Sequence, residues 1–481
     1  MIIGREKEKK QLNKILGSKE SELLVIYGRR RVGKTYLIRE YFSNKKCLLM
    51  HVTGVDKSPM KTQLKKFSDA FSQTFLNSIP IEIPQSWDNA FKLLDQQIKL
   101  NPTSKIVVFL DELPWLATRK SDLLKTIDSY WNQYWSHLKN IVVVLCGSSA
   151  SWMIKNIIYN KGGLHNRVTC EIFLSPFSLS ETKEFLRYRG INLNNRHILE
   201  IYMAIGGVPY YLKYVEKNLT AEENIQEIFF RKNAPLFDEF NKLFQSLFNN
   251  APAYIEIIRL TAQVRNGLTR SELQSSAKLS TNGGRLSERL SNLCRSGFLE
   301  EYTPWGRKTG EYYKVIDEFC LFYLTWVGEG KNRKFTNNYW LEKSRSQTFI
   351  SWSGYTFESI CFKHIEQITK ALNIKTGIEV GSWRFIPRKH TETGAQIDLL
   401  IDRTDSSVTL CEIKYSNTPY VIDKSYAENL MRKIKIFTDK LKINKQIFLS
   451  IIAANGIKKN RYSEEMVNGI VTLDDLFEKV D

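Results

Sequence analysis

Residues 22–42 constrain the fold of this chain more than any other stretch, because a strand, a glycine-bearing loop and a helix follow one another there. Residues 23–27 are a short apolar run typical of a buried parallel strand. Residues 28–35, Gly-Arg-Arg-Arg-Val-Gly-Lys-Thr, fit the phosphate-binding pattern G-x-x-x-x-G-K-[ST]. Apolar side chains then recur at helical spacing over residues 37–42. This context predicts a loop that holds the phosphates of a nucleotide.

The residue types of the loop suit that chemistry. Gly28 and Gly33 let backbone N–H groups curl around a phosphate, and the following helix points its positive end at the same anion. Lys34 is expected to reach the β- and γ-phosphates of ATP, and the Thr35 hydroxyl to bind Mg²⁺. The predicted nucleotide-binding set is Gly28, Arg29, Arg30, Arg31, Val32, Gly33, Lys34, Thr35 and Ser148.

A second motif ends in two carboxylates. The apolar run 106–110 is followed by Asp111 and Glu112, at the carboxyl end of a predicted strand, where ligands bind in open α/β sheets. Asp111 is expected to hold Mg²⁺, directly or through water. Glu112 is expected to act as the general base on the attacking water.

Two later segments add candidates to this site. Residues 141–149 predict a buried strand that ends in Ser148 and Ser149, and either serine is expected to sense the γ-phosphate or to cap a helix. Residues 161–168 form a glycine-rich loop with Arg167. That arginine is expected to stabilise transition-state charge, within one chain or across a subunit boundary in a homo-oligomer, unless it is an ordinary surface residue.

The composition sets wider bounds. A chain of 481 residues is too long for one core, so we expect two to four domains. No apolar run reaches membrane-spanning length, the start of the chain has no signal-peptide core, and the seven cysteines are scattered, which together favour a cytoplasmic protein that needs no membrane. The net charge of +19 favours a polyanionic partner, usually nucleic acid, although a generally basic proteome would give the same excess.

Residues 253–315 predict three short helices followed by a two-stranded hairpin. Thr269 and Glu272 match a capping box at the start of the second helix. The third helix carries several arginines, at Arg285, Arg289 and Arg295. The pattern resembles a winged helix-turn-helix, whose third helix would enter the DNA major groove. The alternative is a module that serves only in protein packing.

The last part of the chain carries a possible hard-metal site. Strands around Asp398 and over residues 409–414, joined as a hairpin, would bring Asp398 near Glu412, with Lys414 on the same face as Glu412. The two carboxylates would hold Mg²⁺ or Mn²⁺, and Lys414 would position or deprotonate a water that attacks a phosphodiester. Glu358, in a predicted helix, is expected to contribute directly or through water.

Six motifs in order resemble the archaeal-type ATPases of the AAA+/STAND branch over roughly residues 1–250. They are Ile3–Glu6, Tyr27–Thr35, Leu110–Glu112, Gly147–Ser149, Leu174–Phe177 and Gly206–Pro209. The resemblance implies a five-stranded parallel sheet with a helical lid. One difference concerns the arginine loop, where Leu164-His-Asn-Arg167 stands in place of the expected Leu-Tyr-Gly-Arg.

The C-terminal motif resembles the PD-(D/E)xK nuclease fold, in the form found as a C-terminal domain on these ATPases. Asp398 and Glu412-Ile-Lys414 match its motif, Glu358 matches its helical acid, and Ile397 replaces its proline. The resemblance implies a small α/β domain that binds Mg²⁺ or Mn²⁺ and cleaves nucleic acid. A degenerate domain that only binds or assembles is the alternative.

We therefore expect an α/β protein of four parts. These are a P-loop ATPase core (1–180), a helical lid (181–250), a winged helix-turn-helix (251–335) and a restriction-endonuclease-like domain (336–481). The expected function is a Mg²⁺-dependent ATPase that binds DNA and cleaves it under the control of ATP. The alternative is an ATP-switched regulator that binds DNA or protein and whose nuclease-like domain is catalytically silent.

Overall fold

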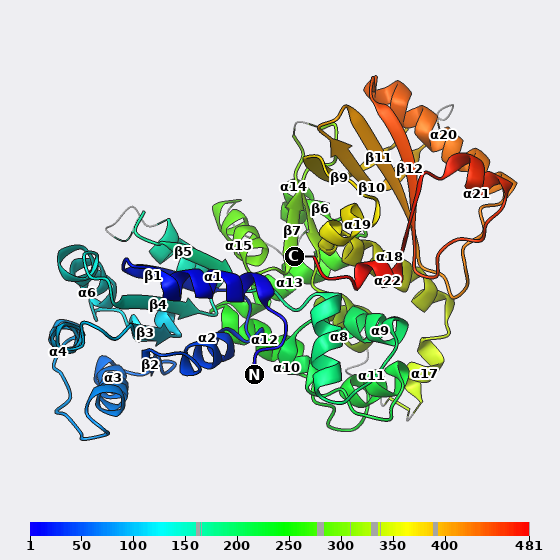
Figure 1. Cartoon of the computed structure of the whole chain (residues 1–481). Coiled ribbons are helices and arrows are strands. Elements are labelled where there is room, and N and C mark those ends of the chain that lie inside the picture. The colour runs from blue at the N-terminus through cyan, green and yellow to red at the C-terminus, as the bar shows by residue number, and fades with distance from the viewer. Residues whose placement is uncertain are drawn as a thin grey trace. The chain divides into compact units, whose positions relative to one another are not determined.

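The computed structural model of the chain describes residues 1–159, 164, 166–276, 283–307, 309–328, 335–336, 338–387 and 393–480. The chain divides into two compact units (Figure 1). The first unit comprises Met1–Pro176, Ser246–Asn249 and Ser291–Gly297, and the second comprises Phe177–Gln245, Asn250–Leu290 and Phe298–Asp481. Each unit has its own sheet and its own core, and each is described separately below.

The first unit alternates strands and helices. Its strands are β1 (Glu22–Tyr27), β2 (Leu48–Thr53), β3 (Ile106–Asp111), β4 (Ile141–Gly147) and β5 (Cys170–Phe173). Its helices are α1 (Glu6–Gly17), α2 (Lys34–Ser43), α3 (Met60–Phe75), α4 (Trp87–Leu100), α5 (Leu113–Leu116), α6 (Leu123–Tyr130), η1 (Trp131–Trp135), α7 (Ala150–Met153) and η2 (Ile154–Ile158).

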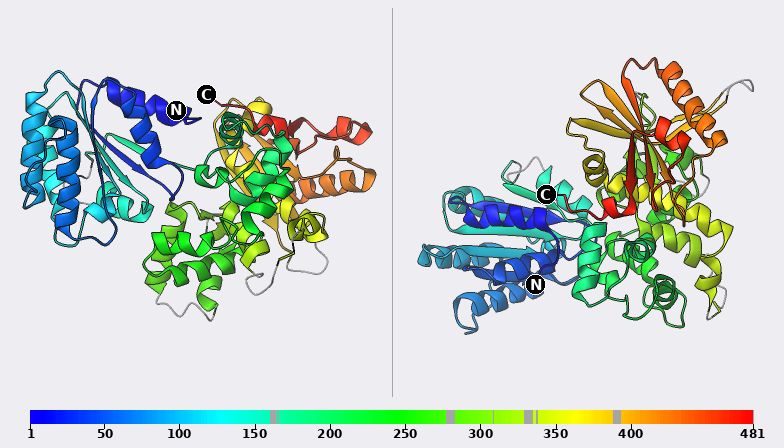
Figure 2. Two further views of the ribbon diagram at one scale, coloured as in Figure 1. Left: turned by 90° about the horizontal axis from the view of Figure 1, so that it is seen from below. Right: turned by 45° about the vertical axis from the view of Figure 1, so that its right-hand side comes forward.

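The five strands form one parallel sheet in the order β2-β3-β4-β1-β5. Helices α1 and α2 cover one face, and α3, α4 and α6 cover the other (Figure 2). Because both faces are covered, β3 and β4 are buried at every position, which explains their unbroken apolar sequences. The sheet expected from the sequence is confirmed, including its fifth strand.

The second unit is built from many helices and two sheets. Its helices up to the start of the large sheet are α8 (Leu179–Tyr188), α9 (Asn195–Ile205), α10 (Pro209–Leu212), α11 (Ala221–Phe229), α12 (Glu239–Leu247), α13 (Ala251–Ala262), α14 (Arg270–Ser275), α15 (Gly283–Arg295), α16 (Glu318–Phe322), η3 (Tyr323–Val327), α17 (Tyr339–Lys343), α18 (Gln347–Lys363) and α19 (Ile365–Ala371). Of these, α12 and α15 end among residues assigned to the first unit. Strands β6 (Leu268–Thr269), β7 (Leu299–Tyr302) and β8 (Tyr312–Val315) form a small antiparallel sheet in the order β6-β8-β7.

The hairpin β7–β8 and the helices expected between residues 253 and 295 are present. At the start of α14 the Thr269 side chain accepts a hydrogen bond from the backbone of Glu272, and the Glu272 carboxylate accepts one from the backbone of Thr269. This reciprocal pair is the capping box that the sequence predicts. On α15, Arg285 is exposed, whereas Arg289 and Arg295 are half-buried.

The larger sheet of the second unit is mixed. It contains β9 (Ile378–Phe385), β10 (Ala395–Arg403), β11 (Ser407–Lys414), β12 (Gln446–Ala453) and β13 (Gly469–Thr472), with helices α20 (Lys424–Leu441), α21 (Arg461–Met466) and α22 (Leu473–Leu476). The strand order is β13-β12-β11-β10-β9, antiparallel from β9 to β11 and parallel from β11 to β13. A β-bulge interrupts the β9–β10 pairing between Ile397 and Leu400, next to Asp398.

Helices α8 and α9 pack closely against the rest of the second unit. Gly207 follows α9, and a side chain there would bring its Cβ within 1.9 Å of the Phe177 carbonyl oxygen, so only glycine fits. His364, at the end of α18, is buried and accepts a hydrogen bond at Nε2 from the backbone N–H of Leu179, at 3.2 Å. Its Nδ1 lies 2.8 Å from the Ile360 carbonyl oxygen, which requires a neutral ring with the proton on Nδ1.

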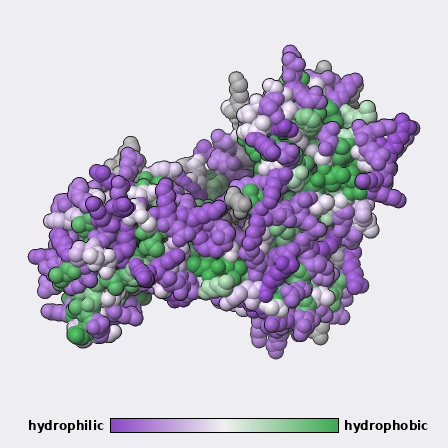
Figure 3. Space-filling model, viewed as in Figure 1, coloured by the Kyte–Doolittle hydropathy of each residue, from purple (hydrophilic) through white to green (hydrophobic). Residues whose placement is uncertain are grey.

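The face of the molecule shown in Figure 3 is mainly hydrophilic, with small scattered apolar patches. Over the described part of the chain, no helix combines the length and the apolar character needed to cross a membrane.

The buried His364 predicts an acid-sensitive second unit. Burial lowers the pKa of His364 from 6.5 to about 4, so the unfolded chain binds the proton more tightly. The free energy of unfolding is therefore highest above pH 6.5. It falls as the pH drops below that value, by about 2 kcal/mol between pH 7 and pH 5.

Urea unfolding of the full chain at these two pH values measures this loss. His364→Gln, which keeps neutral hydrogen-bonding groups, is expected to reduce the difference between the two curves. His137→Gln, at an exposed histidine, is the matched control and should leave the difference unchanged. Equal pH dependence of wild type and His364→Gln would contradict the prediction.

Candidate functional site

The loop between β1 and α2 has the backbone of an anion-binding site. Gly28 adopts φ 143°, and a Cβ there would lie 2.4 Å from the Leu174 carbonyl oxygen. Gly33 adopts φ 97° and directly precedes α2. Arg31 also has a positive φ, of 76°. Successive left-handed and right-handed residues turn backbone N–H groups towards one side of the loop, which is how such loops bind phosphate.

Lys34 begins α2 and lies within this loop. Its Nζ donates hydrogen bonds to the carbonyl oxygens of Gly28, at 2.9 Å, and Arg29, at 3.0 Å. Burial lowers the pKa of Lys34, while the nearby Glu112 and Asp111 carboxylates act in the opposite direction. A buried ammonium group is costly to desolvate, so a phosphate that pairs with Lys34 gains a strong, charge-assisted contact.

Thr35 and Asp111 join the loop to the neighbouring strand β3. The Thr35 hydroxyl donates to Asp111 Oδ2 at 2.9 Å, and His51 Nε2 lies 3.5 Å from the same oxygen. Burial alone would raise the pKa of Asp111, but hydrogen bonds from His51, from Cys146 and from the threonine outweigh it and lower that pKa. The result is an ionised carboxylate beside a hydroxyl, which are oxygen ligands that suit Mg²⁺.

Glu112 is held by the strand on the other side of β3. The Ser148 hydroxyl donates to Glu112 Oε1 at 2.5 Å, and the Ser148 backbone N–H donates to Oε2 at 3.3 Å. Glu112 itself adopts a left-handed conformation, φ 49°, at the end of β3. Ser149 begins α7 and its side chain makes no capping hydrogen bond. Of the two serines, Ser148 therefore contacts the candidate general base.

Arg167, the predicted arginine finger, and Arg5, in the first motif of the chain, have different surroundings. Arg167 is exposed, and its backbone N–H donates to the Leu164 carbonyl oxygen at 3.1 Å. The two glycines of its loop, at positions 162 and 163, lie outside the described residues. Arg5 is buried and donates to the Val32 carbonyl oxygen at 3.3 Å, so the first motif supports the phosphate-binding loop itself.

A second cluster of charged side chains lies on the large sheet of the second unit. The antiparallel register of β10 and β11 pairs Leu399 with Cys411, which sets Asp398 beside the Glu412–Ile413 segment. Asp398 Oδ2 accepts a hydrogen bond from the Ile413 backbone N–H at 3.1 Å. Because the β-bulge shifts the β9 side of β10 at this point, Asp398 is released from regular pairing with β9.

Glu412 is buried and makes several contacts. Lys433 Nζ, on α20, donates to both of its carboxylate oxygens, at 2.7 and 2.8 Å. The Tyr426 hydroxyl, also on α20, donates to Oε2 at 3.0 Å. Lys414 Nζ lies 3.7 Å from the same oxygen, so Glu412 and Lys414 share one face of β11. Burial and the neighbouring Asp398 raise the pKa of Glu412, and Lys433 opposes that rise.

Glu358 joins the cluster from α18. It forms an ion pair with Arg265. Burial and the nearby Asp398 raise the pKa of Glu358 to about 7, although Arg265, Lys314 and Lys414 act in the opposite direction. Two carboxyl groups thus have raised pKa values around a third, Asp398. Four cations, Lys314, Lys414, Lys433 and Arg265, surround these three carboxyl groups. Burial and the negative charge of Asp398 still disfavour ionisation of Glu358 and Glu412, an effect that a bound divalent cation would oppose.

The residues around Asp398 fit a hard cation only in part. Asp398 and Glu412 offer carboxylate oxygens, the ligand type that Mg²⁺ and Mn²⁺ prefer. Yet Glu412 is engaged by Lys433 and Tyr426, which a bound cation would have to displace. Among the described residues, no group of three or more His, Cys, Asp or Glu side chains is placed to hold a metal ion.

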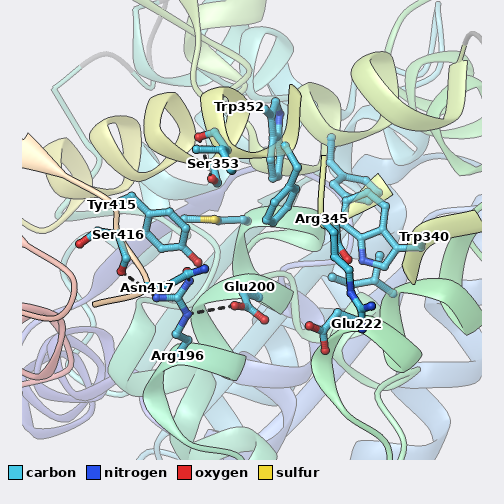
Figure 4. Close-up of a pocket in the computed structure, with 16 residues that line it drawn as sticks. Arg196, Glu200, Glu222, Trp340, Arg345, Trp352, Ser353, Tyr415, Ser416 and Asn417 are labelled. Carbon is cyan, nitrogen blue, oxygen red and sulfur yellow. Dashed lines mark hydrogen bonds and ion pairs between the residues drawn. The ribbon is translucent and has the colours of Figure 1, made fainter. Parts of the chain in front are cut away.

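A cavity of about 520 Å³ lies in the second unit beside the segment that follows Lys414 (Figure 4). Arg196, from α9, stacks over the Tyr415 ring at 4.6 Å and donates to the Ser416 carbonyl oxygen at 3.0 Å. Its Nε pairs with Glu200 at 3.2 Å, and its Nη2 donates to Asn417. These contacts hold the end of β11, and hence Lys414, against α9.

Several residues that contact the candidate sites could not be predicted from the sequence. Lys433 and Tyr426 follow Glu412 on a separate helix, and Arg265 lies 93 residues before its partner Glu358. None of these belongs to a short motif. His51 had a weak signal, because it lies near the end of β2, adjacent to the strand that carries Asp111.

Comparison with known proteins identifies the first part of the chain. Residues 2–215 match the family model of an ATPase domain predominantly from Archaea. An uncharacterized protein of Methanocaldococcus jannaschii is 24% identical over 442 residues, which are 91% of this chain and 92% of that protein. An uncharacterized ATP-binding protein of the same organism is 41% identical over 46 residues, 10% of this chain and 78% of that protein. The chain carries an archaeal-type ATPase domain.

Solved structures also resemble the chain at low identity. A Walker-type ATPase of Pyrococcus abyssi aligns with a TM-score of 0.47 and 19% identity, over 67% of this chain and 96% of that one. The ORC2 protein of Aeropyrum pernix, in its ADPNP–ADP complexes, aligns with a TM-score of 0.44 and 14% identity, over 71% of this chain and 95% of that one.

The contact between Ser148 and Glu112 makes a prediction about ATP hydrolysis. Ser148→Ala removes the hydroxyl that orients the candidate base, so kcat is expected to fall about 10-fold while ATP affinity stays the same. Phosphate release at saturating ATP and nucleotide binding by fluorescence measure the two quantities. Ser149→Ala, at the neighbouring serine, is the matched control and should leave both unchanged. A Ser148→Ala variant with normal kcat would contradict the role assigned to this contact.

Proposed function

We propose that this protein is a Mg²⁺-dependent ATPase that binds DNA and hydrolyses it at a metal-dependent site around Asp398, Glu412 and Lys414, with ATP controlling the cleavage. The observation that carries the ATPase part is the arrangement of Lys34, Thr35–Asp111 and Glu112–Ser148 at the carboxyl edge of one parallel sheet. The nuclease part is supported by the carboxylate and lysine cluster on the mixed sheet.

In the ATPase, the chain itself performs three tasks. The backbone N–H groups of residues 28–35 and the Lys34 ammonium bind and orient the phosphates. Thr35 and Asp111 are the residues that would hold Mg²⁺, which neutralises charge on the phosphate oxygens. Glu112 accepts a proton from the water that attacks the γ-phosphorus, while the bond to the β–γ bridging oxygen breaks. The hydrogen bonds from Ser148 keep the Glu112 carboxylate in place for that step.

In the nuclease, Asp398 and Glu412 are the residues that would hold Mg²⁺ or Mn²⁺, which supplies charge stabilisation for the phosphorane-like transition state. Lys414 orients the attacking water, and Glu358, with its pKa near 7, exchanges a proton with water directly or through a second molecule. Hydrolysis adds the hydroxyl to phosphorus, breaks one P–O ester bond and transfers the water proton to the leaving oxygen. The mixed sheet that carries Asp398 and Glu412, with α18 and α20 beside it, supports this part of the proposal.

DNA is the proposed substrate because of charge and the hairpin module. The chain has 70 Lys and Arg residues against 51 Asp and Glu residues, a net charge of +19 that favours a polyanion. Helices α13, α14 and α15 with the hairpin β7–β8 have the order of elements of a winged helix-turn-helix. The Arg196 contacts with residues 416 and 417 offer a physical link between the lid-like helix α9 and the strand that carries Lys414.

The test is a DNA cleavage assay with Mg²⁺ or Mn²⁺, with and without ATP. Asp398→Asn and Lys414→Ala are each expected to lower the cleavage rate by roughly 100-fold or more. Asp402→Asn, on the same strand but paired with Lys445, is the matched control and should cleave normally. Lys34→Ala should remove the effect of ATP. Cleavage that survives in Asp398→Asn would contradict the proposed nuclease site.

A second candidate function is an ATP-switched regulator whose nuclease-like domain is silent. The observation that favours it is the full engagement of Glu412 by Lys433 and Tyr426, together with the lack of a three-residue metal cluster among the described residues. In that protein Lys433 would be a permanent structural partner of Glu412. In the nuclease, Lys433 would be a partner that a cation displaces.

The variant Lys433→Met distinguishes these two functions. For the nuclease, it frees Glu412 and is expected to raise Mn²⁺ affinity about 10-fold in calorimetric titration, an increase that Asp398→Asn abolishes. For the silent regulator, it leaves a buried carboxylate without its cation, so the protein is expected to lose about 3 kcal/mol of stability and to bind no Mn²⁺. Lys435→Met, on the same helix, serves as the control for the loss of a charge from α20.

A further inference from the structure

A second cavity, of about 280 Å³, reaches two residues of the carboxylate cluster. Its lining includes Glu358 and Asp398, the rings of Tyr302 and Tyr312, and residues of β9 from Val380 to Arg384. All of these residues belong to the second unit. The hairpin β7–β8 therefore forms one wall of a chamber that contains two of the candidate catalytic carboxylates.

The tip of this hairpin is fixed against the large sheet. The Trp305 backbone N–H donates to the Ser382 carbonyl oxygen at 3.0 Å. The Trp305 side chain lies so close to Gly381 that a Cβ there would come within 3.3 Å of it. The centroids of the Trp305 and Phe437 rings are 5.8 Å apart, with the rings tilted by 36°. A hairpin whose tip is packed in this way presents its side chains to the chamber instead of extending outward into a DNA groove.

The chamber combines aromatic rings with cations. The Tyr302 and Tyr312 rings lie 5.8 Å apart between centroids. Arg307, Lys314 and Arg384 also line the cavity. Arg307 and Arg384 are exposed, whereas the Lys314 ammonium lies 5.2 Å from the centre of the Tyr355 ring.

Both negatively and positively charged side chains line the chamber. Glu300 is the third lining carboxylate, after Glu358 and Asp398, so three carboxylates face the three cations. Burial, with Tyr312 and Glu300 nearby, raises the pKa of Tyr302 to about 12, while Arg384 and Arg307 act in the opposite direction. Both arginines line the same cavity as the Tyr302 ring, so their charges are available to a phosphate bound there.

We infer that this chamber binds one unpaired nucleotide of a DNA strand, so that the candidate nuclease acts on single-stranded or locally opened DNA. The cleavage chemistry in this inference rests on the proposed function. The binding of the nucleotide is argued from other residues, namely the aromatic rings and the cations of the chamber. Aromatic rings stack on bases, with the base taken out of the duplex, and arginine and lysine bind the flanking phosphates. The carboxylates Glu358 and Asp398 then face the phosphodiester of the same nucleotide.

The size of the chamber favours an unpaired nucleotide over a duplex. Small-molecule pockets typically measure about 300–1,000 Å³, and this chamber lies just below that range. This volume is of the order of one nucleotide and is smaller than a base pair with its two backbones. A duplex would have to open locally to bring a phosphodiester to Asp398, and the stacking surface of Tyr302 and Tyr312 offsets part of the energy of that opening.

The experiment measures binding and cleavage separately on the full chain. Binding of a fluorescent oligodeoxynucleotide is followed by anisotropy in EDTA, comparing a single strand with a blunt duplex of the same length and salt concentration. Cleavage is followed with Mn²⁺ on the same two substrates and on a duplex with an unpaired flap. Tyr312→Leu keeps bulk but removes the stacking ring, and Arg384→Gln removes an exposed cation from the chamber. Arg231→Gln, at an exposed arginine two residues after α11 and outside the lining, is the matched control.

The single strand is expected to bind at least about 10-fold more tightly than the duplex. Tyr312→Leu and Arg384→Gln should each weaken that binding about 10-fold, and Arg231→Gln should not. Equal affinity for the two substrates, or unchanged single-strand affinity in both chamber variants, would overturn the inference. Cleavage confined to the intact duplex would also overturn it while leaving the proposed nuclease in place. Binding that depends on Tyr312 and Arg384 without cleavage of any DNA would support the chamber and reject the nuclease.

Discussion

Burial of both faces of the parallel sheet determines where the first unit can place polar groups. Strands β3 and β4 are buried along their whole length, so charged side chains on them appear only where the strands end. Asp111, Glu112 and Ser148 all lie at that edge, next to the loop that begins with Gly28. The Thr35–Asp111 and Ser148–Glu112 hydrogen bonds then join three neighbouring strands into one site. Loop, carboxylates and hydroxyl therefore depend on the same packing.

The second unit holds several carboxylates close together. Asp398, Glu412 and Glu358 come from two strands and a helix, and their mutual repulsion raises the pKa of both glutamates beyond the effect of burial. Cations from separate elements oppose that repulsion, namely Lys433 from α20 and Arg265 from the turn after α13. A cluster balanced in this way can exchange a lysine for a metal ion or a substrate phosphate, and the two proposed functions differ in whether that exchange occurs.

Helices α8 and α9 belong to the second unit and contact its other elements directly. Arg196 on α9 binds the chain just after Lys414, and Gly207, two residues after the end of the same helix, packs against Phe177. His364, at the end of the helix that carries Glu358, receives the backbone N–H of Leu179 from α8. Movement of α8 or α9 would therefore act on both Lys414 and Glu358. These contacts couple α8 and α9 to two members of the candidate cluster within one unit.

The sequence by itself determined the parallel sheet, the phosphate-binding loop and the capping box at Thr269, because each depends on residues close together in the chain. It also predicted that Asp398 lies near Glu412, since one hairpin joins their strands. Tertiary structure alone decided that Ser148 contacts Glu112, that Lys433 engages Glu412, and that Tyr312 lines a chamber with Asp398. Those partners come from elements separated by tens of residues, and their approach depends on helix packing and a β-bulge, which leave no periodic or short-range pattern in the chain.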